Sequence, residues 1–282
     1  MFIFIYFCVI FFTVIQSACT KLYNQKYDNS YVFNGIKSLV ALCIFAVIMI
    51  NRMSFHFPTM LYGMLYGLLL SVSMYSGYKA LYLGPMSLTS LLVSFSVLIP
   101  IIYGILFCSE AMTVYKGAGI IFLILTIIFV NIGNMNISAA KDKKWMFFVL
   151  MTFLANGICS VLQKMHQTSF PGMYCSEFMF FAMILSACIF VLIMIMKTDY
   201  KTFKTLPGKK YAAVAGVANV AANYFTLSIS GLENASVLYP AISAGTILMT
   251  LICGMSVFKE RLKYNHFIAL VFGIISIVLL KL

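Results

Sequence analysis

The chain has 282 residues, of which 63% are hydrophobic and 9% are charged, and its mean hydropathy is +1.02. Because about a quarter of the residues in soluble domains are charged, this sequence cannot cover a water-facing surface, and a soluble protein is excluded. The net charge of +12 therefore does not indicate nucleic-acid binding; in a membrane protein its meaning depends on which links carry it.

Apolar runs separated by short polar links fill the whole sequence. A hydrocarbon core of about 30 Å requires roughly 20 helical residues, and backbone groups in lipid are satisfied only within helices or closed barrels. The runs are far longer than barrel strands, so the predicted fold class is an all-α integral membrane protein with ten transmembrane helices. These helices are expected at 2–20, 31–50, 59–83, 86–108, 114–134, 144–164, 174–196, 210–230, 235–257 and 264–281.

The first predicted helix carries polar residues on one face, and the sixth repeats the pattern. In both helices, polar side chains follow the spacing i, i+3, i+4, i+7 and precede a lysine, Lys21 or Lys164. They are Thr13, Gln16, Ser17 and Thr20 in the first helix and Asn156, Cys159, Ser160 and Gln163 in the sixth. The second and seventh helices also match, since 43–50 read CIFAVIMI and 188–195 read CIFVLIMI.

The third and eighth helices carry the most informative stripes, with the spacing i, i+4, i+7, i+11. These stripes consist of Ser71, Tyr75, Tyr78 and Tyr82, and of Asn219, Asn223, Thr226 and Ser230. The fourth and ninth helices match through Ser87, Ser90 and Ser94 against Ser236, Tyr239 and Ser243. In the links that follow them, Glu110 aligns with Glu260.

The offset between matched residues grows steadily along the chain, from 143 in the first and sixth helices to 150 at Glu110 and Glu260. Chance matches would scatter, so two copies of five helices are predicted, at 1–140 and 141–282, within one integrated membrane domain. Because five is an odd number, the second copy is inverted across the bilayer. Inverted repeats are typical of secondary transporters, which bind the solute at the repeat interface.

Short segments at the helix ends resemble those of a known superfamily. They are LFCSEAM (106–112), VFKERL (257–262), and the ALYLGPMSLTSLL and GLENASVLYP segments that lead into the fourth and ninth helices. Over essentially its whole length the chain resembles the drug/metabolite transporter superfamily in its ten-helix EamA-like form. The resemblance implies export or exchange of metabolites, amino acids, drugs or sugar derivatives. It also implies a central cavity lined by helices one, three, four, six, eight and nine.

One position departs from the four-helix multidrug relatives, in which a buried Glu of the first helix exchanges protons for cationic drugs. Thr13 stands where that Glu would be. A carboxylate inside the membrane is the usual proton relay, and the acids of this chain all lie in links or near helix ends. They are Asp28, Glu110, Asp142, Glu177, Asp199, Glu233 and Glu260. Proton-coupled export of lipophilic cations is therefore not expected, and Glu110 is expected to favour the N-terminus of the helix that follows it.

Residues of the polar stripes are predicted to bind the solute. They offer hydroxyls, amides and aromatic faces without a fixed negative charge, which suits a neutral or zwitterionic solute such as an amino acid. A second interpretation remains open for each, because Ser, Thr and Asn also hydrogen-bond between membrane helices. The candidates are Thr13, Gln16, Ser71, Tyr75, Tyr78, Ser94, Asn156, Asn219, Asn223, Thr226 and Ser243.

The predicted function is secondary transport of a small polar or amphiphilic metabolite by alternating access. A lipid-carrier flippase of the same fold is the alternative, and an integral-membrane enzyme is less favoured because acids and histidines do not cluster in the sequence. His56, His166 and His266 lie far apart and the eight cysteines form no CxxC, so no metal or other cofactor is predicted. The expected partners are the solute and membrane lipid, not nucleic acid; the oligomeric state is left open.

The distribution of basic residues predicts the orientation of a multi-pass plasma-membrane protein. The links that follow the first, third, fifth, seventh and ninth helices lie on the same side of the membrane. Together with the adjoining helix ends, which include Lys37 and Lys79, they hold 15 of the 19 lysines and arginines. The positive-inside rule places these links in the cytoplasm and both termini outside, whereas the superfamily resemblance implies cytoplasmic termini. Lys37 and Lys79 lie near helix ends and are expected to snorkel to the membrane interface.

Overall fold

A computed structural model describes residues 2–27, 29–50, 55–83, 86–132, 143–197, 208–257 and 264–281. Every secondary-structure element within these ranges is a helix. The helices are α1 (Phe2–Asn24), α2 (Ser30–Ile50), α3 (Phe57–Leu83), α4 (Met86–Ser94), η1 (Phe95–Val97), α5 (Leu98–Phe107), α6 (Val114–Ile132), α7 (Lys143–Ser169), α8 (Cys175–Lys197), α10 (Lys209–Ser230), α11 (Ala235–Ser256) and α12 (Tyr264–Lys281). Asp28, Asp142, Asp199 and Glu260 lie outside the described residues.

Seven of the described helices are long and apolar enough to cross a membrane. Shorter apolar helices cover Leu92–Phe107, Val114–Val130 and Tyr264–Leu280, where three further spans are predicted. The all-helical architecture and the multi-pass character are thus confirmed, whereas the count of ten transmembrane helices stays a prediction.

The fourth predicted helix is interrupted. A single helix over 86–108 is expected, but a short 3₁₀ turn, η1, separates α4 from α5. Pro100 lies in the first turn of α5 and has no N–H to donate to the carbonyl of Ser96, so the α-helical ladder is broken at this level. Pro240 also removes a bond, yet α11 continues through it from Ala235 to Ser256.

The chain forms two compact units, and each draws on both halves of the sequence. The first unit comprises Met1–Ser71 and His166–Gly231, and the second comprises Val72–Met165 and Leu232–Leu282. α3 and α7 therefore each contribute to both units. The predicted division near residue 140 concerns sequence repeats, not these units, and it stays a prediction.

In the first unit, α10 packs against α1 and α2, and α2 packs against α8. Near the start of α10, Ala212 and Ala215 bury Tyr23 of α1 and Phe33 of α2. These alanines allow two aromatic rings to approach the helix axis, with ring centroids 4.8 Å apart. The aromatic contact fixes the end of α1 beside the beginning of α2.

In the first unit, glycines allow two pairs of helices to cross with their backbones in contact. A Cβ on Gly63 of α3 would lie 2.5 Å from the carbonyl oxygen of Phe178, and one on Gly67 would meet the carbonyl oxygen of Ala182. On α10, a Cβ on Gly216 would lie 2.9 Å from the carbonyl oxygen of Lys37. Small residues spaced four apart are the usual means of bringing membrane helices this close.

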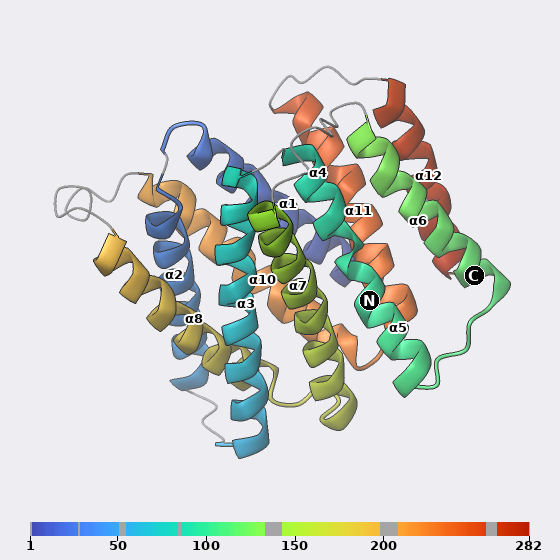
Figure 1. Cartoon of the computed structure of the whole chain (residues 1–282). Helices are drawn as coiled ribbons and strands as arrows, with labels where there is room; N and C mark the ends of the chain where they lie inside the picture. Colours follow the sequence, from blue (N-terminus) through green and yellow to red (C-terminus); the bar gives the residue numbers. More distant parts are fainter. Residues whose placement is uncertain are drawn as a thin grey trace. The chain divides into compact units, whose positions relative to one another are not determined.

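In the second unit, α6 and α12 lie side by side, and α11 packs against α5, α6 and α12 (Figure 1). Leu123 and Ile127 of α6 form a buried cluster with Ala244 of α11. The end of α3 meets α7, where the Thr152 hydroxyl bonds the Ser76 hydroxyl at 2.9 Å. At the start of α7, the buried Trp145 donates its indole N–H to Thr89 of α4 at 2.9 Å.

Candidate functional site

A cluster of amides on α10 connects three helices of the first unit. Asn219 Nδ2 donates to Gln16 Oε1 of α1 at 3.1 Å, and Tyr66 of α3 donates its hydroxyl to Asn223 Oδ1 at 2.8 Å. Asn223 Nδ2 in turn donates to the backbone carbonyl of Asn219 at 2.9 Å. The structure therefore brings together three predicted solute-binding residues, Gln16, Asn219 and Asn223.

Tyr66 belongs to this cluster although the sequence analysis missed it. It lies five residues before Ser71, out of step with the i, i+4, i+7 stripe of its helix. Its ring is 3% exposed and packs against Phe178, at a centroid distance of 5.3 Å. A buried tyrosine needs a partner for its hydroxyl, and Asn223 supplies it.

Four predicted binding residues hydrogen-bond to their own helix. Each hydroxyl donates to the backbone carbonyl four residues earlier, at 2.7–2.8 Å. They are Thr13, Ser71, Ser94 and Thr226. Because the hydroxyl proton is used within the helix, these residues offer a solute only an acceptor oxygen in this conformation.

The remaining candidates lie in the second unit. Asn156 of α7 accepts a hydrogen bond from the Ser73 hydroxyl of α3 at 2.5 Å, which favours the interpretation of Asn156 as a link between helices. Tyr75 is 37% exposed, and the Lys79 ammonium lies 6.0 Å from its ring centroid. Tyr78 and Ser243 lie on α3 and α11 of this unit.

The predicted site combines two walls that do not belong to one unit. One wall is Ser71, Tyr75 and Tyr78, and the other is Asn219, Asn223 and Thr226. Ser71 and the α10 residues belong to the first unit, and the two tyrosines belong to the second. The opposition of the walls therefore stays a prediction, and the described part of the site is the amide cluster on α10.

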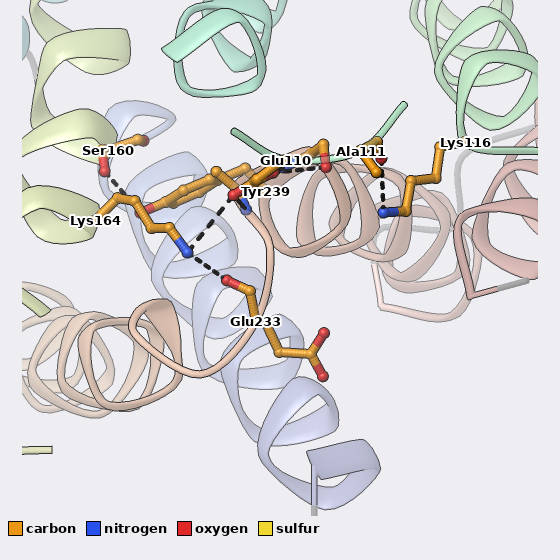
Figure 2. A network of polar contacts seen from close by, with 9 residues as sticks. Glu110, Ala111, Lys116, Ser160, Lys164, Glu233 and Tyr239 are labelled. Carbon is orange, nitrogen blue, oxygen red and sulfur yellow. Dashed lines mark hydrogen bonds and ion pairs between the residues drawn. The ribbon is translucent and has the colours of Figure 1, made fainter. Parts of the chain in front are cut away.

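A buried ionic network occupies one end of the second unit (Figure 2). Glu110 accepts from the backbone N–H groups of Ala235 and Ser236 at 2.6 and 2.9 Å, and from the Ser236 hydroxyl at 2.7 Å. Lys164 Nζ lies 3.6 Å from Glu110 Oε1 and donates to the backbone carbonyl of Glu233 at 2.6 Å. The Glu110 and Lys164 side chains are 4% and 7% exposed.

Glu110 therefore caps α11, not the helix that follows it in sequence. The expectation that it favours the N-terminus of α6 is wrong: the chain turns after α5, with Ser109 in a left-handed conformation (φ 53°), and the carboxylate reaches the first turn of α11. Free N–H groups and the positive end of the helix dipole stabilise a carboxylate there. The same end of the unit is held by Tyr239, whose hydroxyl donates to the Ser160 carbonyl at 2.6 Å (Figure 2).

Two histidines that are distant in sequence meet in the first unit. Thr59 Oγ1 lies 2.9 Å from His56 Nδ1 and 3.0 Å from His166 Nε2. Glu177 accepts the backbone N–H of His56 at 2.5 Å. Spacing in the sequence gave no signal for this cluster, because the contact joins the start of α3 to the end of α7. Among the described residues, no group of three or more His, Cys, Asp or Glu could hold a metal ion.

The direction of these hydrogen bonds follows from Gln167. Its Oε1 accepts from the Gly172 N–H at 2.9 Å and its Nε2 donates to the Met173 carbonyl at 3.1 Å, which fixes the amide orientation. Its second amide proton points at His166 Nδ1, 3.0 Å away, so the neutral His166 ring carries its proton on Nε2 and donates to Thr59. The Thr59 hydroxyl then donates to His56. The result is a one-directional chain of hydrogen bonds that joins α3 to α7.

Comparison with known proteins shows that the fold occurs in solved structures. No protein-family model matches the sequence, and no curated protein matches it. Among solved structures, 28 chains match. One, described only as "Crystal structure of protein", has a TM-score of 0.79 over 99% of this chain and 96% of its own length, at 14% sequence identity. At this identity the similarity shows a shared fold and nothing about the solute or activity.

Proposed function

We propose that the protein is a secondary transporter that moves a small polar or amphiphilic metabolite, amino-acid-like or drug-like, by alternating access. Ten transmembrane helices in two inverted five-helix repeats would supply two related conformations, each open to one side of the membrane. A lipid-carrier flippase of the same fold is the alternative. Plasma-membrane location and membrane orientation remain part of the proposal.

Two similar helix crossings in the first unit support the repeat and carry the proposal. In each, an aromatic residue and a residue one turn later meet two small residues spaced four apart on the other helix. One crossing joins Phe178 and Ala182 of α8 to Gly63 and Gly67 of α3, and the other joins Phe33 and Lys37 of α2 to Ala212 and Gly216 of α10. The offset between the α2 and α8 positions is 145, as for the matching runs at 43–50 and 188–195. The offset between the α3 and α10 positions is 149, one more than the 148 of the polar stripes on these two helices.

Equivalent contacts are what a two-fold relation between copies requires, since every contact in one copy must have a counterpart in the other. The packing of α2 against α8 and of α6 against α12 also supports the repeat. Each of these pairs joins a helix of the first copy to its predicted mate in the second. The amide cluster of Gln16, Asn219 and Asn223 supports a polar solute. Its hydrogen bonds described above join the amides to one another and to the Tyr66 hydroxyl, and none of these bonds involves a carboxylate.

Exchange in proteoliposomes tests this proposal. Vesicles loaded with unlabelled L-amino acids should accumulate the labelled forms through the purified protein, and accumulation should persist when a protonophore removes any pH gradient. The reason is that Thr13 replaces the proton-carrying Glu, and that Glu110 and Glu177 accept backbone N–H groups. Absence of exchange for every amino acid would refute amino-acid transport. Strict dependence on the gradient would instead assign a proton relay to Glu110, Glu177 or Glu233.

The amide cluster yields a prediction for Asn223. If its side chain binds the solute, Asn223→Ala should weaken apparent affinity about tenfold, which corresponds to about 1.4 kcal/mol and to one hydrogen bond left unmade. If Asn223 only links helices, the same substitution should lower the melting temperature and leave affinity unchanged.

Tyr66→Phe is the matched control, because it removes only the hydroxyl that donates to Asn223. It should lower the melting temperature and retain most of the affinity. Thermal unfolding and solute titration of each purified variant separate the two roles. Unchanged affinity in both Asn223→Ala and Tyr75→Ala would place the solute elsewhere, between the fourth and ninth predicted helices.

A further inference from the structure

Glu110 is bonded to α11, although it lies in the link after α5. Three hydrogen bonds from Ala235 and Ser236 engage both of its carboxylate oxygens. A Cβ added to Gly104 of α5 would lie 2.7 Å from the same carboxylate, so α5 also borders it closely. Val237, in the next position of α11, packs with apolar residues of α5, α6 and α12. The start of α11 is thus packed on several sides, and Glu110 is attached to it.

α7 meets the start of α11 through three polar contacts of a looser kind (Figure 2). Lys164 of α7 lies 3.6 Å from Glu110 and donates to the Glu233 carbonyl at 2.6 Å. Tyr239 of α11 donates to the Ser160 carbonyl of α7 at 2.6 Å. We call these three contacts the latch. Each of them can break without disturbing the hydrogen bonds that attach Glu110 to α11.

The latch shows that α7 and α11 run in opposite directions at this end of the unit. Lys164 binds the link before α11, whereas Ser160, one turn earlier in α7, binds Tyr239 within α11. One further turn along each helix leads to Asn156 and Ser243, both of which the sequence marks as candidates for solute binding. These two residues therefore lie behind the latch, further from the ends of their helices.

Polar groups with unused hydrogen-bonding capacity lie at this deeper level. Asn156 accepts a bond from Ser73 through Oδ1, and its Nδ2 has no hydrogen-bond partner in the described part of the chain. Ser243 makes no hydrogen bond to any described residue, and the buried Thr246 hydroxyl also lacks a partner among them. Ser243 and Thr246 follow Tyr239 at i+4 and i+7, on one face of α11. A polar solute that passed the latch would find donors and acceptors here.

Gly157 gives α7 a point about which its end can move. A Cβ at this position would overlap the Ile99 side chain, so α7 touches α5 here. Earlier in α7, Trp145 and Thr152 bond to α4 and α3. Glycine is a position where a helix bends readily, and Lys164 lies about 10 Å further along the helix. A small bend at Gly157 would therefore break the latch and leave the earlier part of α7 in place.

We propose that the latch is a gate of the transporter, which opens when the Lys164 and Tyr239 contacts break while Glu110 stays on α11. This inference rests on the proposed transport function and names a part that moves. The closed latch separates the polar groups behind it from this end of the unit, and the open latch admits the solute to them. The sequence repeats supply a counterpart for the opposite side of the membrane, because Lys21 and Glu260 match Lys164 and Glu110.

Cys159 reports on the state of the latch. It precedes Ser160, is 6% exposed and lies within electrostatic range of the Tyr239 hydroxyl. A buried thiol reacts slowly with N-ethylmaleimide, so opening of the latch should speed the labelling of Cys159. Cys175 of the first unit, which is 7% exposed, serves as the reference thiol. Mass spectrometry of the labelled peptides measures each rate in the purified protein.

Lys164→Met should raise the labelling rate of Cys159 about tenfold or more, as the loss of a hydrogen bond from a charged group predicts, and leave Cys175 unchanged. Tyr239→Phe keeps the ring and removes one neutral bond, so it should raise the rate about fivefold. Lys116→Met is the matched control, because this lysine also donates to a backbone carbonyl at this end of the unit (Figure 2). It should label as the unmodified protein does. In proteoliposomes, Lys164→Met should exchange amino acids about threefold more slowly, since alternating access requires this end to close.

Two labelling results would overturn the assignment. One is an unchanged rate at Cys159 in the variants, and the other is an equal increase at Cys159 and Cys175, which would show that the latch only stabilises the fold. Normal exchange alongside either result would leave the transport function standing. Should Lys164→Met fail to fold, Tyr239→Phe decides by the same two rates. Absence of exchange in the unmodified protein would refute amino-acid transport, whereas the labelling rates would still show whether the latch opens.

Discussion

Glu110→Gln should lower the melting temperature of the purified protein by roughly 10 °C, because it breaks a buried ionic network. Both carboxylate oxygens of Glu110 accept hydrogen bonds from the first turn of α11, and Lys164 lies 3.6 Å away. Glutamine has a single acceptor oxygen, so its NH₂ group would face another N–H donor. Lys164 would also remain buried without a counter-charge, the more costly of the two losses.

Glu233→Gln provides the control for Glu110→Gln. Glu233 contributes its backbone carbonyl to Lys164, and in Figure 2 its carboxylate points away from that ammonium. The control should therefore melt within about 2 °C of the unmodified protein. Combining Glu110→Gln with Lys164→Met should cost less than the sum of the two single changes, since the second removes the stranded charge. An unchanged melting temperature for Glu110→Gln would mean that the network does not stabilise the start of α11.

Gly67→Ala should destabilise the first unit by about 2 kcal/mol, which is the usual cost of overpacking a tight contact. The new methyl group would meet the carbonyl oxygen of Ala182, and backbone cannot move aside as a flexible side chain can. The two helices would have to separate, and the packing on both sides of the crossing would loosen. Thermal unfolding in a mild detergent measures the loss.

Two further glycine-to-alanine changes isolate the effect of the contact. At Gly117 of α6 a Cβ would have no atom within 4 Å, so Gly117→Ala should keep or slightly raise stability through helix propensity. At Gly216 the Cβ would lie 2.9 Å from the Lys37 carbonyl oxygen, so Gly216→Ala should fall between the other two. All three changes share the same gain in propensity. Equal melting temperatures for Gly67→Ala and Gly117→Ala would show that the α3–α8 crossing is not tight.

Hydropathy predicted individual helices well because a membrane span is a local property of the sequence. The run expected at 235–257 corresponds to α11, Ala235–Ser256, and the run at 210–230 to α10, Lys209–Ser230. The run at 86–108 was predicted less well, since hydropathy does not register a lost backbone hydrogen bond. Pro100 was visible in the sequence, but a proline does not by itself show whether a helix is interrupted, since α11 continues through Pro240.

Helical spacing predicted which polar residues share a face, and the structure joins Gln16, Asn219 and Asn223 through α10. Spacing could not predict contacts between distant segments. Glu110 binds a helix that begins 125 residues later, and nothing near either residue in the sequence indicates the pairing. The burial of Lys37 was not predicted for a related reason. Its distance from the helix end allowed snorkelling, and only the packing of α2 against α10 shows that its face is buried.

The interleaving of the two units has a consequence for biogenesis. Tyr23 of α1 packs against Ala212, so the first unit cannot close until α10 has left the ribosome. At typical elongation rates of about 5–20 residues per second, α1 waits about 10 to 40 s for that partner. During this interval Gln16 and Lys37 reside in a nascent membrane segment without their final surroundings. Helices with such residues insert less readily than purely apolar helices, so the early helices are least stable in the membrane before the second half of the chain arrives.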